Sequence, residues 1–208
     1  VASIFPMQQE GTFLLGALAA MMSKTGIIGY VGGDQIDRFI ADDVKFTFKY
    51  QGDSRYRRVV PSPKPVAILE HQAIRLLADA GFVVVACGGG GIPVIEVAGG
   101  WSGVDAVIDK DLAGEKMARQ IGADKFVILT DVDGLYMDYK KPTQRLVKEV
   151  RVGQPGAVNI SQLEEGSMGP KVGACLEFVR NGGREAVIAS LDRLVDAVEG
   201  LSGTHFFP

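Results

Sequence analysis

Short apolar runs alternate with amphipathic segments along most of the chain after residue 67. The apolar runs predict strands at residues 82–87, 106–108, 125–130, 186–189 and 203–207. The segments with helical periodicity predict helices at residues 68–80, 111–121, 171–181 and 191–199, with a shorter one at residues 159–165. Strands that alternate with helices in this way indicate an α/β fold, a three-layer arrangement in which a mainly parallel sheet lies between helices.

The residues before this region follow a different pattern. Residues 10–24 are apolar almost all round, which predicts a buried helix that Gly26 ends. A short strand is expected at residues 27–31, and the alternation at residues 44–50 predicts a half-exposed strand. The polar and basic stretch at residues 51–58 predicts a loop.

Composition argues against several classes of protein. The formal net charge of −3 disfavours a general nucleic-acid binder, since such proteins carry a basic excess. The chain has no apolar run of about 18 residues, so no membrane span is expected. No basic segment opens the chain, so we expect no signal peptide. Cys87 and Cys175 lie far apart and form no CxxC pattern, which fits a reducing, cytoplasmic compartment.

Glycine is abundant, at 27 of 208 residues, and several glycines follow apolar runs. Gly88, Gly89, Gly90 and Gly91 come directly after the strand predicted at residues 82–87. Without β-carbons in the way, backbone N–H groups can surround an anion, so this run is a candidate phosphate site. A mobile turn without a ligand is the alternative.

Two further candidate sites place a lysine at the start of a predicted helix. Asp109, Lys110 and Asp111 stand between a strand and a helix, where Lys110 can attract a phosphate and Asp111 can cap the helix. Residues 166–171 enter a later helix, whose N-terminal N–H groups attract anions, and Lys171 adds positive charge. A solvated charge run and an ordinary capped helix start are the alternatives, although the second leaves Lys171 unexplained.

In their order along the chain, these motifs resemble those of carbamate kinase, a member of the amino-acid kinase superfamily. The resemblance covers about residues 55–208 and is carried by residues 57–65, 87–94, 103–111 and 166–172. Residues 128–136 and 140–142 are similar to superfamily stretches that flank the adenine nucleotide. The resemblance implies an amino-acid-kinase-like fold and reversible phosphoryl transfer from ATP to carbamate, with Mg²⁺, giving ADP and carbamoyl phosphate.

The resemblance also implies roles for single residues. Lys110 and Lys171 would hold the transferring phosphoryl group, and Asp111 would orient the lysines. Gly88–Gly91 would line the junction between phosphate and carbamate. The residues implied along the nucleotide are Asp109, Thr130, Asp131, Tyr136, Tyr139, Lys141, Pro142, Ser167 and Met168. No residue is assigned as a metal ligand, no nucleic-acid or membrane partner is implied, and a homodimer is compatible with the resemblance.

The N-terminal part departs from carbamate kinases. It contains neither a Gly-Gly-Asn-Ala turn after a first strand nor a Gly-Asn-Gly-Pro-Gln-Val segment, and the subdomain that contributes a further lysine is missing. Residues 1–39 instead resemble a segment of the basic membrane protein family of nucleoside-binding lipoproteins, although any buried helix before a glycine-ended strand would look similar. We therefore expect residues 1–54 to be a segment of different origin and residues 55–208 to be the ATP/ADP-binding domain.

Three hypotheses about function stay open at this point. The first is a carbamate kinase, incomplete in this chain. The second is an adenine-nucleotide-binding α/β domain, or a composite chain, without turnover, which the missing N-terminal motifs favour. The third is a small-molecule binding protein whose function is set by residues 1–39.

Overall fold

The structure is a computed structural model. It describes the backbone of residues 29–31, 34–35, 47–50, 56–153 and 168–208, and the side chains among these from residue 60 onward. The helices predicted at residues 10–24 and 159–165 lie outside the described residues, and so does Ser167 of the expected nucleotide site. None of the described helices is both long and apolar enough to cross a membrane.

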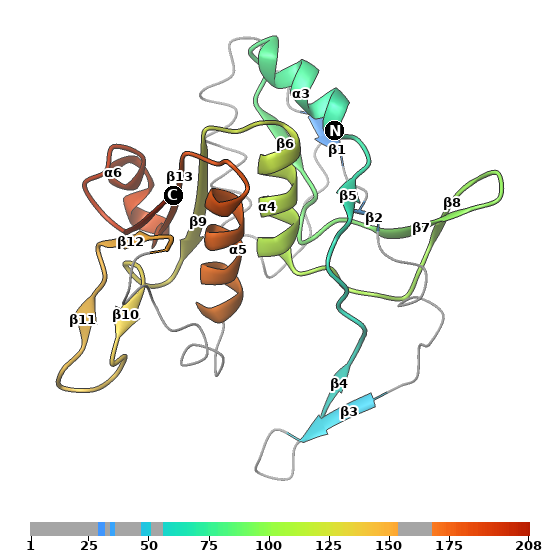
Figure 1. The fold of residues 1–208 in the computed structure, drawn as a ribbon. Helices are drawn as coiled ribbons and strands as arrows, with labels where there is room; N and C mark the ends of the chain where they lie inside the picture. Colours follow the sequence, from blue (N-terminus) through green and yellow to red (C-terminus); the bar gives the residue numbers. More distant parts are fainter. Residues whose placement is uncertain (1–28, 32–33, 36–46, 51–55, 154–167) are drawn as a thin grey trace. The chain divides into compact units, whose positions relative to one another are not determined.

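Two compact units make up the chain, Val1–Met117 (unit 1) and Ala118–Pro208 (unit 2). The boundary expected near residue 54 therefore falls inside unit 1, whereas the structure divides the chain at the helix that follows Asp109. Figure 1 labels most of the elements of both units.

Short strands in the described part of unit 1 pair into small sheets. The largest sheet has the order β5-β2-β7-β8, formed by Ala67–Ile68, Asp34–Gln35, Pro93–Val97 and Gly100–Gly103. Its inner pair, β2 and β7, is parallel, and both outer pairs are antiparallel. Two-stranded sheets join β1 to β6 in parallel and β3 to β4 antiparallel, at Gly29–Val31, Val84–Ala86, Thr47–Tyr50 and Tyr56–Val59.

Several expectations for unit 1 need correction. Residues 56–58 were expected in a loop, but they belong to β4, whose backbone pairs antiparallel with β3. The strand expected at residues 106–108 is not found, since these residues belong to none of the described helices or strands. Strand β6 is present but half-buried rather than buried on both faces, since it pairs with β1 alone among the described strands.

The helices of unit 1 follow the predicted periodicity. Helix α3 spans His71–Asp79 and begins later than expected, because Ile68 pairs with β2 as part of β5. Gly81 ends this helix with a φ of 87°, the left-handed conformation that glycine adopts without strain. Helix α4 spans Lys110–Gln120, within one residue of the predicted bounds at each end.

Unit 2 is built on a four-stranded sheet with the order β12-β14-β13-β9. These strands are Glu149–Arg151, Thr204–Phe207, Glu185–Ser190 and Lys125–Thr130. Strand β13 runs parallel to β9 and antiparallel to β14, while β14 runs parallel to β12. The α/β prediction is confirmed, and the pairing within the sheet is mixed because the chain turns back after β13 through η2 (Leu191–Arg193) and α6 (Leu194–Val198).

Helices cover both faces of this sheet (Figure 1). On one face, Phe178 of α5 (Met168–Arg180) meets Phe126 of β9, with ring centroids 5.6 Å apart. On the other face, Ala197 of α6 packs with Val187 and Ala189 of β13. Successive residues of a strand point to opposite faces, which is why β13 is apolar throughout its centre and fully buried there. Unit 2 is thus a three-layer α/β/α arrangement in its own right.

A hairpin that the sequence analysis did not predict follows β9. Its strands are β10 (Tyr136–Met137) and β11 (Arg145–Leu146), which pair antiparallel. Because each strand has only two residues, neither gives a periodic signal in the sequence. The hairpin lies beyond the carboxyl end of β9, the edge of an α/β sheet where ligands bind.

Candidate functional site

The glycine run of unit 1 forms a tight turn with an unusual backbone. Cys87 has a φ of 61°, and Gly88, Gly90 and Gly91 also have positive φ values. The amides of Gly90 and Gly91 donate to the carbonyl oxygen of Cys87, at 3.0 and 2.6 Å. A non-glycine residue in this conformation stores strain, of the kind found at ligand-binding sites. These bonds give the loop a defined shape within its glycine-rich sequence.

Gly90 brings this loop against the segment that enters α4. A β-carbon at Gly90 would lie 2.2 Å from the carbonyl oxygen of Ile108, closer than any real contact. Ile108 is itself buried, and it directly precedes Asp109. The structure therefore brings together two of the three motifs singled out in the sequence, and only a glycine allows that approach.

Asp109, rather than Asp111, caps helix α4. Its Oδ1 accepts hydrogen bonds from the amides of Asp111 (2.8 Å) and Leu112 (3.2 Å). Asp111 was expected to cap the helix, but these cap bonds are made by Asp109, and Asp111 lies within the first turn and is buried, with 7% exposed. Lys110 lies between them and is exposed. The start of α4 thus holds its own carboxylate on the helix amides and leaves the ammonium group of Lys110 at the surface.

Lys171 lies in the first turn of α5 in unit 2 and is buried, with 6% exposed. Met168, the first residue of this helix, is half-buried, and Pro170 is exposed. Proline is tolerated here because amides of the first turn have no partner within the helix. A buried ammonium group needs compensating charge or hydrogen bonds, so Lys171 is more than a solvated helix start.

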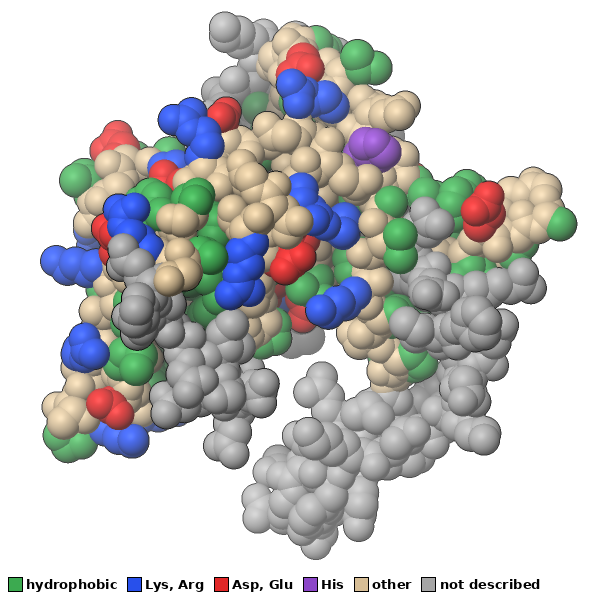
Figure 2. Space-filling model, viewed as in Figure 1, with side chains coloured by type: hydrophobic (Ala, Val, Ile, Leu, Met, Phe, Trp, Pro, Cys, Tyr) green, Lys and Arg blue, Asp and Glu red, His purple; other side chains and the backbone are tan. Residues whose placement is uncertain are grey.

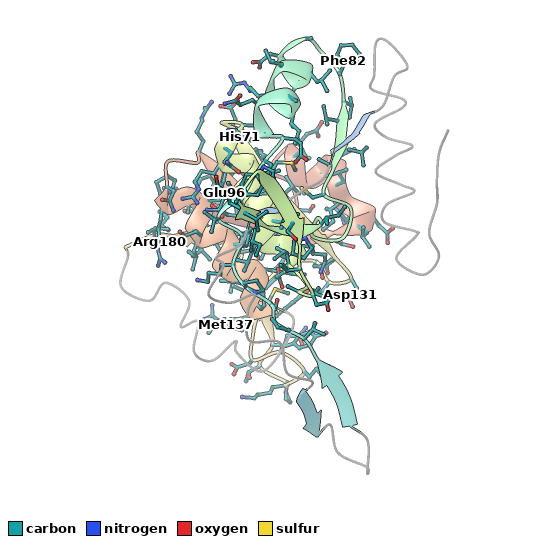
Figure 3. All side chains as sticks on the ribbon, turned by 90° about the vertical axis from the view of Figure 1, so that its right-hand side faces the viewer. His71, Phe82, Glu96, Asp131, Met137 and Arg180 are labelled. Carbon is teal, nitrogen blue, oxygen red and sulfur yellow. The ribbon has the colours of Figure 1, made fainter. Side chains whose placement is uncertain are left out.

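The expected nucleotide residues of unit 2 gather after β9. Thr130 ends the strand, and its hydroxyl donates to Oδ1 of Asp131 at 3.0 Å. Asp131 is exposed. Figure 3 labels Asp131 and Met137, which belong to the loop after β9 and to the hairpin that continues it.

Aromatic and basic side chains lie on the hairpin. The rings of Tyr136 and Tyr139 lie 6.1 Å apart at 39°. Nζ of Lys140 lies 5.5 Å from the ring centroid of Tyr139, a cation–π distance. Nζ of Lys141 lies 3.4 Å from Oδ1 of Asp138, and Pro142 is exposed beside it.

Tyr136 is the residue of the hairpin whose ionisation is perturbed. Its hydroxyl donates to Oδ2 of Asp133 at 3.0 Å. Partial burial raises the pKa of Tyr136, and the hydrogen bond to Asp133 and the negative charges of Asp133 and Tyr139 raise it further. The phenol therefore stays protonated at neutral pH and acts as a hydrogen-bond donor.

Comparison with known proteins places these motifs in a family. The sequence model of the amino acid kinase family matches residues 15–190. The chain belongs to the amino acid kinase family. The match takes in most of the segment before residue 55, whereas the resemblance of residues 1–39 to basic membrane proteins stays a prediction.

Carbamate kinases are prominent among the similar proteins. One from Thermococcus kodakarensis is 52% identical over 187 residues, which are 89% of this chain and 59% of that protein. One from Pyrococcus horikoshii is 40% identical over 190 residues, which are 91% of this chain and 60% of that protein. A solved carbamate kinase from Giardia lamblia, bound to AMP-PNP, has a TM-score of 0.72 at 32% identity and covers 95% of this chain and 74% of its own. This amino acid kinase therefore spans about three fifths of the length of the curated relatives it matches.

A second group of charged side chains lies at the other end of β9 in this amino acid kinase. Nζ of Lys125 lies 2.8 Å from Oε2 of Glu185, and Nδ1 of His205 lies 2.6 Å from Oε1 of the same carboxylate. Nε2 of His205 lies 2.9 Å from the carbonyl oxygen of Ser202, so both ring nitrogens face acceptors. The group joins the first residues of β9 and β13 to β14. Along β9 it stands roughly 16 Å from Thr130, so it belongs to the framework of unit 2 rather than to the candidate site.

Two opposing effects act on Glu185 in this group. Partial burial acts to raise its pKa, but the hydrogen bonds and charges of Lys125 and His205 together lower the pKa below its ordinary value. The carboxylate is therefore ionised at neutral pH and accepts hydrogen bonds from Lys125 and His205. Elsewhere on the face seen in Figure 2, Lys and Arg side chains are interspersed with acidic ones and form no single basic patch among the described residues.

Sequence reasoning missed several partners of the expected site residues. Asp133, Asp138 and Lys140 each contact one of them. The sequence feature that could have indicated these contacts is their spacing, because Asp133 and Tyr136, like Asp138 and Lys141, are three residues apart in a polar loop. That spacing brings side chains together only where the chain turns, and the hairpin was not predicted.

Proposed function

We propose that this chain is the nucleotide-binding part of a carbamate kinase and that it takes part in reversible phosphoryl transfer between ATP and carbamate. The observation that carries the proposal is the 52% identity over 187 residues to a carbamate kinase. The tight glycine loop and the helix starts at Lys110 and Lys171 support it, because they supply the amides and cations that phosphoryl transfer requires. The nucleotides, the acceptor and the metal are parts of this proposal.

The loop after β9 and the hairpin β10–β11 bind the adenine nucleotide in this proposal. Tyr136 and Tyr139 offer aromatic surface, and Lys141 adds positive charge beside them. Their place beyond the carboxyl end of a sheet strand is the usual place for such ligands in α/β proteins. The Giardia lamblia enzyme, whose structure contains AMP-PNP, supports adenine nucleotides as the ligand class.

Lys110 and Lys171 neutralise the phosphoryl group in transfer, and Asp111 orients the lysines. An oxygen of carbamate forms a bond to the terminal phosphorus of ATP while the bond from that phosphorus to the bridging oxygen breaks, and ADP leaves with the electron pair. Carbamate is already an anion, so no general base is needed. Amides of Gly88–Gly91 and the two ammonium groups stabilise charge that spreads over the transferring oxygens.

Mg²⁺ is part of the proposal because it would supply positive charge between the phosphates. In the part of the chain that the structure describes, no three His, Cys, Asp or Glu side chains gather as a metal site. Mg²⁺ usually binds through phosphate oxygens, waters and one or two carboxylates, and in this proposal the exposed carboxylate of Asp131, in the loop after β9, is a candidate ligand.

A second candidate function is nucleotide binding without turnover by the 208-residue chain alone. The observation that favours it is the length of the match, since this chain spans 59% of the Thermococcus kodakarensis enzyme. Positioning both reactants can supply ~7–11 kcal/mol of a barrier, so a chain that positions only the nucleotide loses most of the rate. We also propose that the protein is located in the cytoplasm and forms a homodimer.

One assay distinguishes the two candidates. Purified chain is supplied with ADP, carbamoyl phosphate and Mg²⁺, and ATP formation is followed by a coupled reaction, with Lys110→Ala as the control. Turnover that Lys110→Ala abolishes supports phosphoryl transfer by this chain. We expect instead saturable ADP binding by calorimetry with little or no turnover. If ADP does not bind at millimolar concentration, both candidates are wrong.

A further inference from the structure

We propose that Thr204 is a positioning residue for the nucleotide, whose hydroxyl holds both ends of hairpin β10–β11 in place. The proposal rests on the function proposed above, since it assigns that hairpin to the nucleotide. Thr204 is the first residue of β14 and carries none of the expected motifs. The hydrogen bonds of its hydroxyl, however, go to the two ends of the segment on which Tyr136, Tyr139 and Lys141 lie.

The hydroxyl of Thr204 bridges the residues that precede and follow the hairpin. Its Oγ1 accepts a hydrogen bond from the amide of Leu135 at 2.8 Å, directly before β10. It donates to the carbonyl oxygen of Val147 at 2.5 Å, directly after β11. The amide of Val147 in turn donates to the carbonyl oxygen of Leu135 at 2.8 Å. These three bonds hold the two ends of the hairpin together, and the hydroxyl of Thr204 makes two of them.

The close fit at Gly134 shows how tightly this base is built. A β-carbon at Gly134 would lie 2.6 Å from Oγ1 of Thr204 and 3.0 Å from its backbone nitrogen. The backbone of the loop therefore passes directly over Thr204, which only a glycine permits. The approach aims the amide of Leu135 at the hydroxyl, so the loop and the side chain fit as one unit.

Thr204 is anchored in the sheet that also carries the nucleotide loop. It pairs with Ile188 of β13, and Ile188 pairs with Ile128 of β9. The loop that leaves β9 is thus tied to a strand on the far side of β13. Through Thr204, the hairpin takes its position from the rigid centre of unit 2 rather than from its own short strands.

Because the hydroxyl of Thr204 is buried, its removal should change the position of the hairpin. Thr204 and Leu135 have no exposed surface, whereas Tyr139 at the end of the hairpin is 51% exposed. If the hydroxyl is removed, the buried amide of Leu135 and the part-buried carbonyl oxygen of Val147 both lose their partner. The base of the hairpin must then shift, and the side chains beyond it move with it. A threonine suits this task because its branched side chain restricts χ1 and keeps the hydroxyl aimed.

The test compares three variants of the full 208-residue chain. Thr204→Val keeps the shape and removes the hydroxyl, Thr204→Ser keeps the hydroxyl, and Ile188→Val removes one methyl from a buried neighbour in the same sheet. We expect Thr204→Val to weaken ADP binding by about tenfold in calorimetry, while Thr204→Ser stays within about threefold of the parent. Ile188→Val should lower stability to urea without changing ADP affinity, because it leaves the hairpin base intact.

Hydrogen exchange supplies the readout that a purely structural role would not move. In Thr204→Val, exchange should rise selectively in residues 133–147 and be restored in Thr204→Ser. If Ile188→Val and Thr204→Val lower ADP affinity equally, or if exchange rises evenly over unit 2, Thr204 only stabilises the fold and the proposal is wrong. If the parent chain binds no ADP, the proposed function fails, and selective exchange in residues 133–147 alone decides whether Thr204 holds the hairpin.

Discussion

Gly90 lies against the carbonyl oxygen of Ile108 so closely that a β-carbon would come within 2.2 Å of it. The contact joins a loop of four glycines to the segment that enters α4, and therefore restrains the distance between the backbone amides of the loop and Lys110. Both belong to unit 1, so the contact is fixed within one compact part of the chain. Phosphoryl transfer depends on such positioning more than on covalent chemistry by the protein.

The first prediction concerns this contact. Gly90→Ala should lower the free energy of unfolding by about 2–3 kcal/mol, because the methyl group overlaps the carbonyl oxygen of Ile108. Gly99→Ala is the matched control, since Gly99 also has a positive φ, of 92°, but has nothing within 4 Å of its β-carbon position. Its cost should be about 1–2 kcal/mol, from backbone strain alone. Urea unfolding measures the stability of both variants. Equal losses would show that the overlap with Ile108 adds nothing to the backbone strain at Gly90.

The second prediction tests the cap of α4. Asp109→Ala should cost about 1 kcal/mol of stability, because the amides of Asp111 and Leu112 lose their acceptor. Asp109→Asn should retain most of the stability that the cap contributes, since an amide oxygen accepts the same hydrogen bonds. Asp105→Ala, at a nearby exposed position, should change stability little. A loss at Asp111→Ala together with no loss at Asp109→Ala would restore Asp111 as the cap.

The third prediction follows from the lowered pKa of Glu185. A carboxylate whose pKa is lower in the folded state stabilises the fold at pH values above its unfolded pKa of about 4.3, and this contribution is lost as pH falls through the folded pKa. Glu185→Gln should therefore cost about 1–3 kcal/mol at pH 7. The difference between parent and variant should shrink towards acid pH.

Urea unfolding between pH 7 and pH 3 measures this difference. Glu149→Gln is the control, because the ion pair of Glu149 with Arg151 is about half exposed and contributes little. A difference at Glu185 that stays constant over this range would mean that the carboxylate is not the stabilising species.

The fourth prediction separates phosphate recognition from base recognition. Lys171→Ala should weaken ADP by about tenfold or more while leaving adenosine nearly unchanged, because only ADP carries the charge that the ammonium group would meet. Arg180→Ala, at the exposed end of the same helix, should affect neither ligand. Equal losses of ADP and adenosine in calorimetry would place Lys171 away from the phosphates.

Local pattern alone was enough to predict several regular elements of the chain. Strand β9 has the predicted bounds, and α4 lies within one residue of its predicted bounds. Long apolar runs and helical periodicity act over neighbouring residues, so they can be read without knowing the path of the chain. The glycine loop and the two lysine-bearing helix starts were found in the same way, as motifs at the ends of such elements.

The structure alone decided how these pieces meet. The contact of Gly90 with Ile108, the cap made by Asp109, and the hydroxyl of Thr204 at the base of the hairpin each depend on residues brought together by the fold. Thr204 and Leu135 are 69 residues apart, and nothing in the periodicity of either segment indicates the other. Sequence determines which segments are helix or strand because those preferences are local, whereas hydrogen bonds between distant segments depend on sheet order and register, which tertiary packing sets.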